Sequence, residues 1–116
     1  MSDNSCIFCR IAEGEIPATV VYEDDEIVAF EDVNPQAPTH LLLIPRKHVP
    51  SLNSVGTDDG GWAARLILAA PQVAREAGVH QDGYRVVINT GSEGGQAVDH
   101  VHMHLLGGRR MTWPPG

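Results

Sequence analysis

Three histidines alternate with apolar residues in the run His100-Val101-His102-Met103-His104. Successive side chains of a β-strand point to opposite faces, so the spacing predicts that the three imidazoles share one face. A single histidine on a strand is usually a hydrogen-bonded polar group, but three on one face indicate a common chemical task. Imidazoles suit two such tasks near neutral pH: metal ligation, and acid–base or nucleophilic catalysis.

The residues before this run favour catalysis at a phosphate group. A glycine-rich segment, residues 89–96, leads directly into the histidines. Glycine lets the backbone approach an anion and turn N–H groups toward it. Such a segment alone is more often an ordinary turn, but beside imidazoles it is typical of a phosphate site with histidine as nucleophile or acid. His40 opens another predicted strand, so we expect it to meet the three histidines across the sheet.

The Cys6-Ile7-Phe8-Cys9 motif is a second candidate site. A structural zinc ion needs four nitrogen or sulfur ligands, and the two cysteines supply half of them. His48 and His100 are the candidates for the other half. The segment lacks the strand–helix context of a thioredoxin-like redox motif. The alternative interpretation is two thiols that only pack in the interior.

The remaining sequence predicts one α+β domain over residues 1–116 that positions these groups. Two short strands follow a short N-terminal helix, and a main helix ends at Gly78 and carries Pro71, which predicts a kink or an early break. Strands in hairpin-like succession around one main helix indicate an antiparallel sheet of about five strands. The predicted helices are 6–12 and 62–77, capped by Thr57 or Asp58, and the predicted strands are 20–23, 27–30, 40–44, 84–89 and 100–106.

Composition excludes several classes of protein. Eight Lys and Arg residues stand against 15 Asp and Glu residues, a net charge of −7, so the chain lacks the basic face of a nucleic-acid-polymer binder. The longest apolar stretch, residues 66–70, is too short to span a bilayer. We expect no secretory signal in the polar N-terminus and no disulfide framework, and therefore a cytoplasmic protein without a membrane partner.

The run from His100 to Leu106 resembles the His-φ-His-φ-His-φ-φ signature of the histidine triad (HIT) superfamily. Further blocks resemble its Hint branch, the histidine triad nucleotide-binding proteins that act as purine nucleoside phosphoramidases. The resemblance implies a HIT-like fold and a homodimer whose two sheets join into one extended sheet. The blocks that carry it are residues 8–11, 15–18, 32, 35–48, 89–96, 107–109 and 113–116.

The resemblance also implies a reaction and a site. The P–N bond of a purine nucleoside 5′-phosphoramidate is hydrolysed through a nucleotidyl–histidine intermediate, with no metal required for the chemical step. By motif position His102 is the nucleophile, and His104 contacts the phosphate oxygens. His100 and His40 support them through hydrogen bonds. The implied nucleotide-binding positions are Phe8, Ile11, Phe30, Asp32, Val33, Asn89, Gly95, Gln96, Ala97, His102 and His104, and the implied zinc ligands are Cys6, Cys9, His48 and His100.

The sequence departs from the Hint pattern at Ala97, where most members carry a serine whose hydroxyl assists the phosphate or the leaving group. This departure supports an alternative hypothesis, a nucleotide-binding or scaffolding protein with weak catalysis. A third hypothesis is a module whose histidine face holds zinc. Dinucleoside polyphosphate hydrolases are a further possibility within the superfamily, but the short chain and the Trp-Pro-Pro-Gly ending favour the Hint branch.

The C-terminal segment Trp113-Pro114-Pro115-Gly116 is predicted to lie extended against a surface, because the two prolines stiffen it and remove backbone donors. Trp113 offers a large apolar face for such a contact. In the Hint branch this tail borders the leaving-group pocket of the partner subunit. The resemblance therefore implies that Trp113 influences selection of the amine and not of the purine; the alternative is a disordered terminus.

Overall fold

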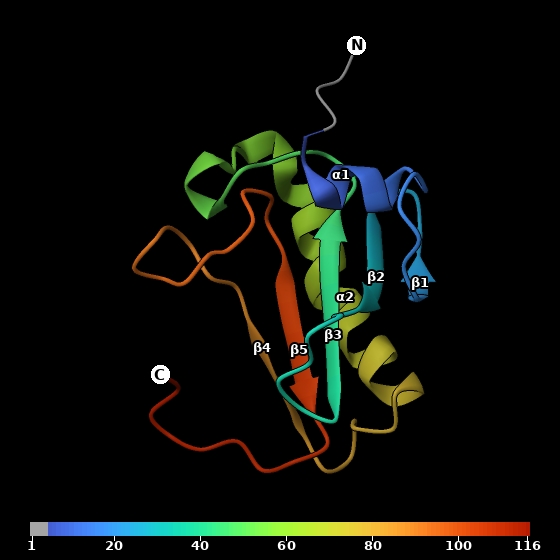
Figure 1. Cartoon of the computed structure of the whole chain (residues 1–116), viewed down its shortest axis with the longest axis vertical. Helices are drawn as coiled ribbons and strands as arrows, with labels where there is room; N and C mark the ends of the chain where they lie inside the picture. Colours follow the sequence, from blue (N-terminus) through green and yellow to red (C-terminus); the bar gives the residue numbers. More distant parts are fainter. Residues whose placement is uncertain (1–4) are drawn as a thin grey trace.

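Five strands form one antiparallel sheet, in the order β1-β2-β3-β5-β4, in the computed structural model, which describes residues 5–116 (Figure 1). A short helix, α1, precedes the sheet, and a long helix, α2, connects β3 to β4. The predicted α+β fold with one main helix is thereby confirmed. The elements are α1 Ile7–Ala12, β1 Val20–Glu23, β2 Ile27–Glu31, β3 Thr39–Pro45, the 3₁₀ turns Leu52–Ser54 and Thr57–Asp59, α2 Gly60–Glu76, β4 Tyr84–Val87 and β5 Met103–Gly107.

Strand β3 lies at the centre of the sheet and is apolar on both faces. Leu41 and Leu43 belong to the larger core cluster, which includes the inner side of α2. Leu42 and Ile44 belong to a second cluster on the opposite face, which includes Phe8 of α1. A strand buried on both sides has no polar face, so its sequence is a continuous apolar run instead of an alternation. Figure 1 shows α2 behind the sheet and α1 beside the C-terminal end of β3.

Helix α2 runs from Gly60 to Glu76 without a break at Pro71. Proline removes the hydrogen bond to the carbonyl four residues earlier, which belongs to Ile67. Ile67 is exposed, so water can satisfy that carbonyl and the predicted early break does not occur. The helix ends as predicted before Gly78, whose φ of 80° is a conformation that glycine adopts without strain. The buried residues of α2 are Trp62, Leu66, Ala69, Ala70, Val73 and Ala74.

The start of α2 differs from the prediction. The residue before the helix is Asp59, and neither Thr57 nor Asp58 caps it. The buried carboxylate of Asp59 instead accepts hydrogen bonds from the backbone N–H of Gly56 (2.8 Å), the indole N–H of Trp62 (2.8 Å) and the ammonium group of Lys47 (2.7 Å). The backbone N–H bond is the leading cause that lowers the pKa of Asp59 to about 2. Asp59 thus ties the helix start to the segment that follows β3.

Two predicted strands are longer than the observed ones. Strand β4 ends at Val87 instead of residue 89, and β5 begins at Met103 instead of residue 100. The reason for the second difference is that the backbone N–H of Val101 bonds to the carbonyl of Val49, outside the sheet (2.8 Å). The alternation of faces still holds, because Val101 joins Met103 in the larger core. His100 and His102 therefore lie in an irregular segment, which the bond between Val101 and Val49 attaches to the part of the chain that follows β3.

No helix among residues 5–116 combines the length and the apolar character that crossing a bilayer requires. The expectation that the N-terminus contains no secretory signal rests mainly on residues 1–4, which lie outside the described residues.

Candidate functional site

His102 is held by a backbone carbonyl two residues before it. Its Nδ1 lies 2.7 Å from the carbonyl oxygen of His100. A carbonyl accepts only, so Nδ1 must carry a proton, and in the neutral tautomer Nε2 therefore has the free lone pair. The residue is only 4% exposed, yet it lines an open cavity. One ring nitrogen of His102 is thus fixed in the protein, and the other is available for chemistry.

A chain of hydrogen bonds fixes the protons of His40 and His104. The backbone N–H of Gln36 donates to Nδ1 of His40 (2.9 Å). The proton of His40 must therefore sit on Nε2, which lies 2.9 Å from Nδ1 of His104 and donates to it. His104 is then left with an N–H at Nε2. Burial, with smaller contributions from His102 and His40, lowers the pKa of His104 to about 4, so its ring is neutral at physiological pH.

His102 and His104 line a cavity of about 640 Å³ between α1, β2 and the segment before β5. Its apolar part contains Phe8 and Phe30, whose rings meet edge to face with centroids 5.6 Å apart. The ring of Phe8 also meets the ring of His102, at 5.1 Å. Eight of the predicted nucleotide-binding residues line the cavity: Phe8, Ile11, Phe30, Asp32, Val33, Ala97, His102 and His104.

Three predicted nucleotide-binding residues, Asn89, Gly95 and Gln96, are not in the lining. The side chain of Gln96 bonds within its own surroundings: its amide N–H groups donate to the carbonyls of Pro50 (2.6 Å) and Val98 (3.0 Å). Its amide oxygen accepts the backbone N–H of Gly91 (2.9 Å). Gln96 therefore fastens the glycine-rich loop to the segment after β3, and of this loop region Ala97 and Val98 are the residues that face the cavity.

Sequence reasoning missed other wall residues. Ile7 stands one helical turn before Ile11, so the four-residue spacing on α1 was a usable signal. Leu42 belongs to a strand that is buried on both faces, and its apolar run does not reveal which face meets a ligand. The residues not foreseen are Ile7, Ile16, Pro17, Ala18, Thr19, Glu31, Leu42 and Val98.

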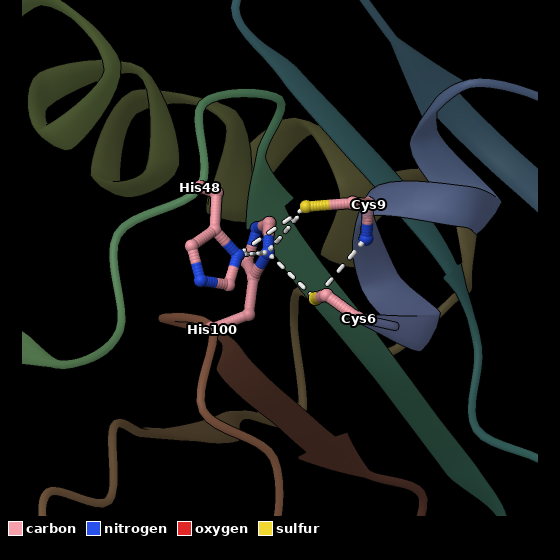
Figure 2. Close-up of side chains that lie close together, drawn as sticks. All are labelled: Cys6, Cys9, His48 and His100. Carbon is pink, nitrogen blue, oxygen red and sulfur yellow. Dashed lines mark hydrogen bonds between the residues drawn. The ribbon is translucent and has the colours of Figure 1, made fainter. Parts of the chain in front are cut away.

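The four predicted metal ligands converge on one point beneath α1 (Figure 2). Nδ1 of His48 lies 3.3 Å from Nδ1 of His100, and Sγ of Cys9 lies 3.3 Å from the first and 3.6 Å from the second. Sγ of Cys6 lies 3.4 Å from Nδ1 of His100. Tetrahedral bonds of about 2.3 Å to sulfur and about 2.1 Å to nitrogen would separate neighbouring ligand atoms by roughly 3.3 to 3.8 Å. The donor set and its spacing therefore fit a tetrahedral metal ion.

The surroundings of these ligands also fit a cation. Nε2 of His100 lies 2.8 Å from the carbonyl oxygen of Pro45 and donates to it, so the lone pair at Nδ1 points toward the other three ligands. Burial lowers the pKa of His100, which keeps its ring neutral. Burial first, and the neighbouring Cys6 second, raise the pKa of Cys9 to about 11. A cation would reverse that effect, because a coordinating thiol loses its proton.

Comparisons with known proteins identify the family of this chain. The family model of the HIT domain matches residues 13–111. An uncharacterised HIT-like protein of Synechocystis is 52% identical over 110 residues, covering 95% of this chain and 96% of the relative. The purine nucleoside phosphoramidase of Escherichia coli is 48% identical over 105 residues, covering 90% and 88%. The crystal structure of a HIT family hydrolase from Legionella pneumophila superposes with a TM-score of 0.93 at 56% identity, covering 97% and 100%. The chain belongs to the HIT domain family.

Proposed function

We propose that the protein hydrolyses the P–N bond of purine nucleoside 5′-phosphoramidates. The observation that carries the proposal is the fixed tautomer of His102, whose Nε2 lone pair is free beside a cavity that also contains the N–H donor of His104. The 48% identity to a purine nucleoside phosphoramidase supports this substrate class. Phe8 and Phe30 supply an apolar, aromatic wall suited to a purine ring.

The first step is attack of Nε2 of His102 on phosphorus. An N–P bond forms, the P–N bond to the amine breaks, and the amine leaves with a proton taken from solvent, which the attacking water returns in the second step. The imidazole then carries a positive charge, which the carbonyl of His100 stabilises through the Nδ1–H bond. Water attacks phosphorus in the second step, the bond to His102 breaks, and the nucleoside monophosphate leaves. Covalent catalysis thereby splits one difficult substitution into two easier ones.

His104 is the proposed donor to the phosphoryl oxygens. Its Nδ1 already accepts the proton of His40, so only Nε2–H is available to the substrate. A donor fixed before the reaction stabilises developing charge without reorganisation. Asp32 is the proposed acceptor for the ribose hydroxyl groups: one carboxylate oxygen accepts the N–H of Asn34 (2.8 Å), and the carboxylate lines the cavity.

The proposed metal ion is zinc, held by the two cysteines and two histidines of the converging group. Four protein ligands close a tetrahedral site and leave no position for substrate, so its role is structural. Catalysis as derived above uses only side chains of this chain. A cysteine pair that serves as metal ligands, and not as a disulfide, also supports a cytoplasmic location.

A homodimer is the proposed assembly. Strand β4 is an edge strand with an exposed Val86, so its outer side can pair with a second copy and extend the sheet. Ile67 and Leu68 of α2 are also exposed. Trp113 is 81% exposed, although Arg85 of β4 holds the adjacent carbonyl of Thr112 (2.9 Å). We propose that the Trp113 tail contacts the partner subunit and influences selection of the amine.

One observation favours the alternative of nucleotide binding with weak catalysis. Ala97 lines the cavity and offers no hydroxyl where most Hint proteins have serine. Loss of a well-aimed transition-state donor costs up to roughly 10²–10³ in rate. In the alternative, the protein keeps its nucleotide affinity and turns over substrate only slowly.

Turnover of adenosine 5′-phosphoramidate by the wild type and by His102→Ala tests the proposal, with AMP affinity measured by calorimetry for both. We expect turnover in the wild type, none in the variant, and similar AMP affinity in both. His80→Ala is the matched control, because His80 is exposed and outside the cavity. AMP binding without wild-type turnover would favour the alternative, and an active His102→Ala would exclude His102 as nucleophile.

A further inference from the structure

Helix α1 contributes residues both to the metal group, which we define as Cys6, Cys9, His48 and His100, and to the cavity. Cys6, which caps the helix, and Cys9 contribute two of the converging ligands. Ile7, Phe8 and Ile11 of the same helix line the cavity. The two sets alternate within six residues, so α1 cannot move relative to one site without moving relative to the other.

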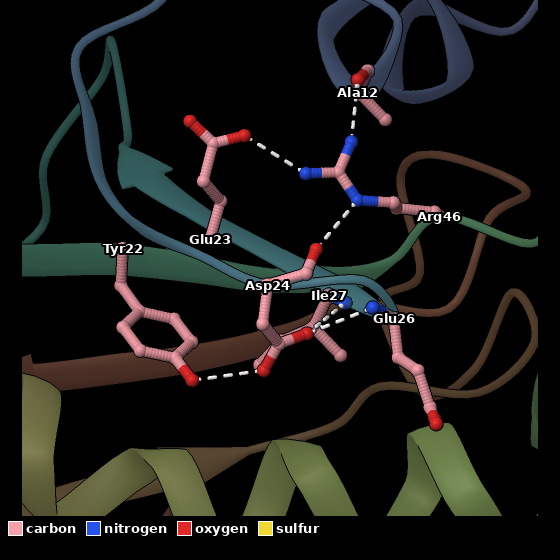
Figure 3. Close-up of polar contacts among 7 residues, drawn as sticks. All are labelled: Ala12, Tyr22, Glu23, Asp24, Glu26, Ile27 and Arg46. Carbon is pink, nitrogen blue, oxygen red and sulfur yellow. Dashed lines mark hydrogen bonds and ion pairs between the residues drawn. The ribbon is translucent and has the colours of Figure 1, made fainter.

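This helix is held by the packing of Phe8 in the second core cluster and by contacts at its two ends. A helix of six residues is too short to be stable alone. At its C-terminal end, the guanidinium group of Arg46 donates to the carbonyl of Ala12 (3.0 Å), to the carbonyl of Asp24 (2.8 Å) and to the carboxylate of Glu23 (2.8 Å) (Figure 3). At its N-terminal end, Sγ of Cys6 lies 3.4 Å from Nδ1 of His100 and Sγ of Cys9 lies 3.3 Å from Nδ1 of His48, and a shared metal ion would replace these weak contacts with bonds.

The turn to which Arg46 bonds is held by hydrogen bonds of its own. The carboxylate of Asp24 accepts the backbone N–H groups of Glu26 (2.8 Å) and Ile27 (2.9 Å), as Figure 3 shows. Burial of this carboxylate opposes its ionisation, but these bonds outweigh burial and lower its pKa to about 2. The C-terminal end of α1 therefore has a firm attachment that does not involve the metal.

His100 forms a second connection between the two sites. Its Nδ1 belongs to the metal group, and its backbone carbonyl holds Nδ1–H of His102. The ring of Phe8 lies against both, with centroids 5.9 Å from His100 and 5.1 Å from His102. A shift of His100 therefore displaces the acceptor that orients His102 and the aromatic wall beside it.

We propose that metal binding and nucleotide binding are thermodynamically linked through α1 and His100, so that the metal-loaded protein binds purine nucleotides more tightly. This inference rests on the proposed function, because it needs the cavity to be the nucleotide site. The metal ion would bind the N-terminal end of α1 to His48 and His100 and thereby hold the cavity wall that contains Phe8 in place. Linkage is reciprocal, so bound nucleotide must raise the affinity for the metal by the same factor.

The first experiment measures AMP affinity by calorimetry for the zinc-loaded and the chelator-treated full chain, and zinc affinity with and without AMP. We expect both affinities to change by one common factor, in the range of about 5 to 150. Equal AMP affinity in the two forms would overturn the linkage and leave the proposed function intact. Absence of AMP binding in both forms would instead contradict the proposed function.

The second experiment separates linkage from a general loss of folding. His48 is an exposed ligand that does not line the cavity, so His48→Ala weakens metal binding without changing the nucleotide wall. We expect the AMP affinity of His48→Ala to be low at limiting zinc and to recover as zinc is raised. His80→Ala, the same substitution at an exposed histidine outside both groups, should behave as the wild type does. An AMP affinity of His48→Ala that does not respond to zinc would overturn the proposal.

Discussion

Two groups of side chains in this molecule each contain a pair of histidines but differ in the chemistry that those histidines can perform. The metal group of Cys6, Cys9, His48 and His100 brings its ligand atoms within 4.8 Å of one another. In a second group, the relay group of Asp32, His40 and His104, the corresponding atoms also lie within 4.8 Å of one another. Oδ2 of Asp32 is 3.4 Å from Nε2 of His40. Spacing alone would therefore assign a metal ion to both.

The partner of the second ring nitrogen separates the two groups. In His100 that partner is a carbonyl, which takes the proton at Nε2 and leaves a lone pair at Nδ1 for a cation. In His40 it is the N–H of Gln36, which occupies Nδ1 and forces the proton onto Nε2, between the ring and His104. A metal ion bound to Nε2 of His40 would displace that proton and leave the His40 ring with no N–H group. The backbone group that bonds to one ring nitrogen thus determines the role of the other. A carbonyl leaves a lone pair for a metal ion, whereas an N–H leaves a proton that is donated to the neighbouring histidine.

The largest expected effect concerns zinc content, which should depend on the metal group and not on the relay group. Cys6→Ser combined with Cys9→Ser should lower the zinc content from about one ion per chain to none, because two of four ligands are lost. Asp32→Asn should keep the full content. Elemental analysis of both purified variants measures this. A remaining zinc ion in the double variant would show that the relay group binds metal and would break the comparison.

A second prediction tests the relay. His40→Ala should lower kcat by about 10²–10³, because His104 loses the donor that fixes its Nε2–H toward the phosphoryl group. Its zinc content should equal that of the wild type. Steady-state kinetics with adenosine 5′-phosphoramidate and elemental analysis provide the two readouts. Unchanged kcat would mean that His104 keeps its orientation without His40.

The relay should also make stability depend on pH. The folded chain takes up a proton at His104 only near pH 4, whereas the unfolded chain does so near the ordinary value of 6.5. The unfolded state therefore binds more protons in this interval, and the free energy of unfolding should fall as the pH drops from about 6.5 to 4, by roughly 1–3 kcal/mol. Urea unfolding of zinc-loaded protein measures the slope. His104→Gln should reduce it and His80→Gln should not; equal slopes in the wild type and His104→Gln would contradict the assignment.

The smallest expected effect concerns the end of α1 that the metal does not hold. Arg46→Gln should weaken AMP binding by about tenfold or less, because α1 loses its bond at Ala12. Arg65→Gln is the matched control: Arg65 contacts Asp24 and Tyr22 in the same turn but makes no bond to α1. Calorimetry with AMP distinguishes them. Equal losses in the two variants would assign the effect to the turn and not to the helix.

Local patterns predicted most of this fold. The apolar run of β3, the glycine that ends α2 and the alternating histidines each depend on near neighbours, and the structure has them at the expected places. The exceptions depend on distant partners. Strand β5 begins late because Val101 bonds to Val49, and Asp59 replaces the expected caps because Lys47 and Trp62 hold its carboxylate.

The same distinction applies to the site. The family resemblance implied that Gln96 is a nucleotide-binding position, and the sequence did not indicate that its side chain bonds to the carbonyls of Pro50 and Val98. The sequence also could not assign the proton positions of His40 and His102, because these depend on backbone atoms that only the folded chain brings close. Residue types and spacing indicated which side chains belong together, and the hydrogen-bond partners determine what each can do.

The order of strands has a consequence for how the molecule acquires activity during folding. Strands β1, β2 and β3 follow one another in the chain and in the sheet, whereas β3 pairs with β5 across more than fifty intervening residues, through contacts such as His40 opposite Leu106. Closing the long loop has the larger entropic cost, so we expect the three-strand meander to form before β5 docks between β3 and β4. The relay group takes His40 from one side of that junction and His104 from the other. The protein therefore becomes active late in folding. Recovery of turnover during refolding would measure completion of the sheet and not the initial collapse of the chain.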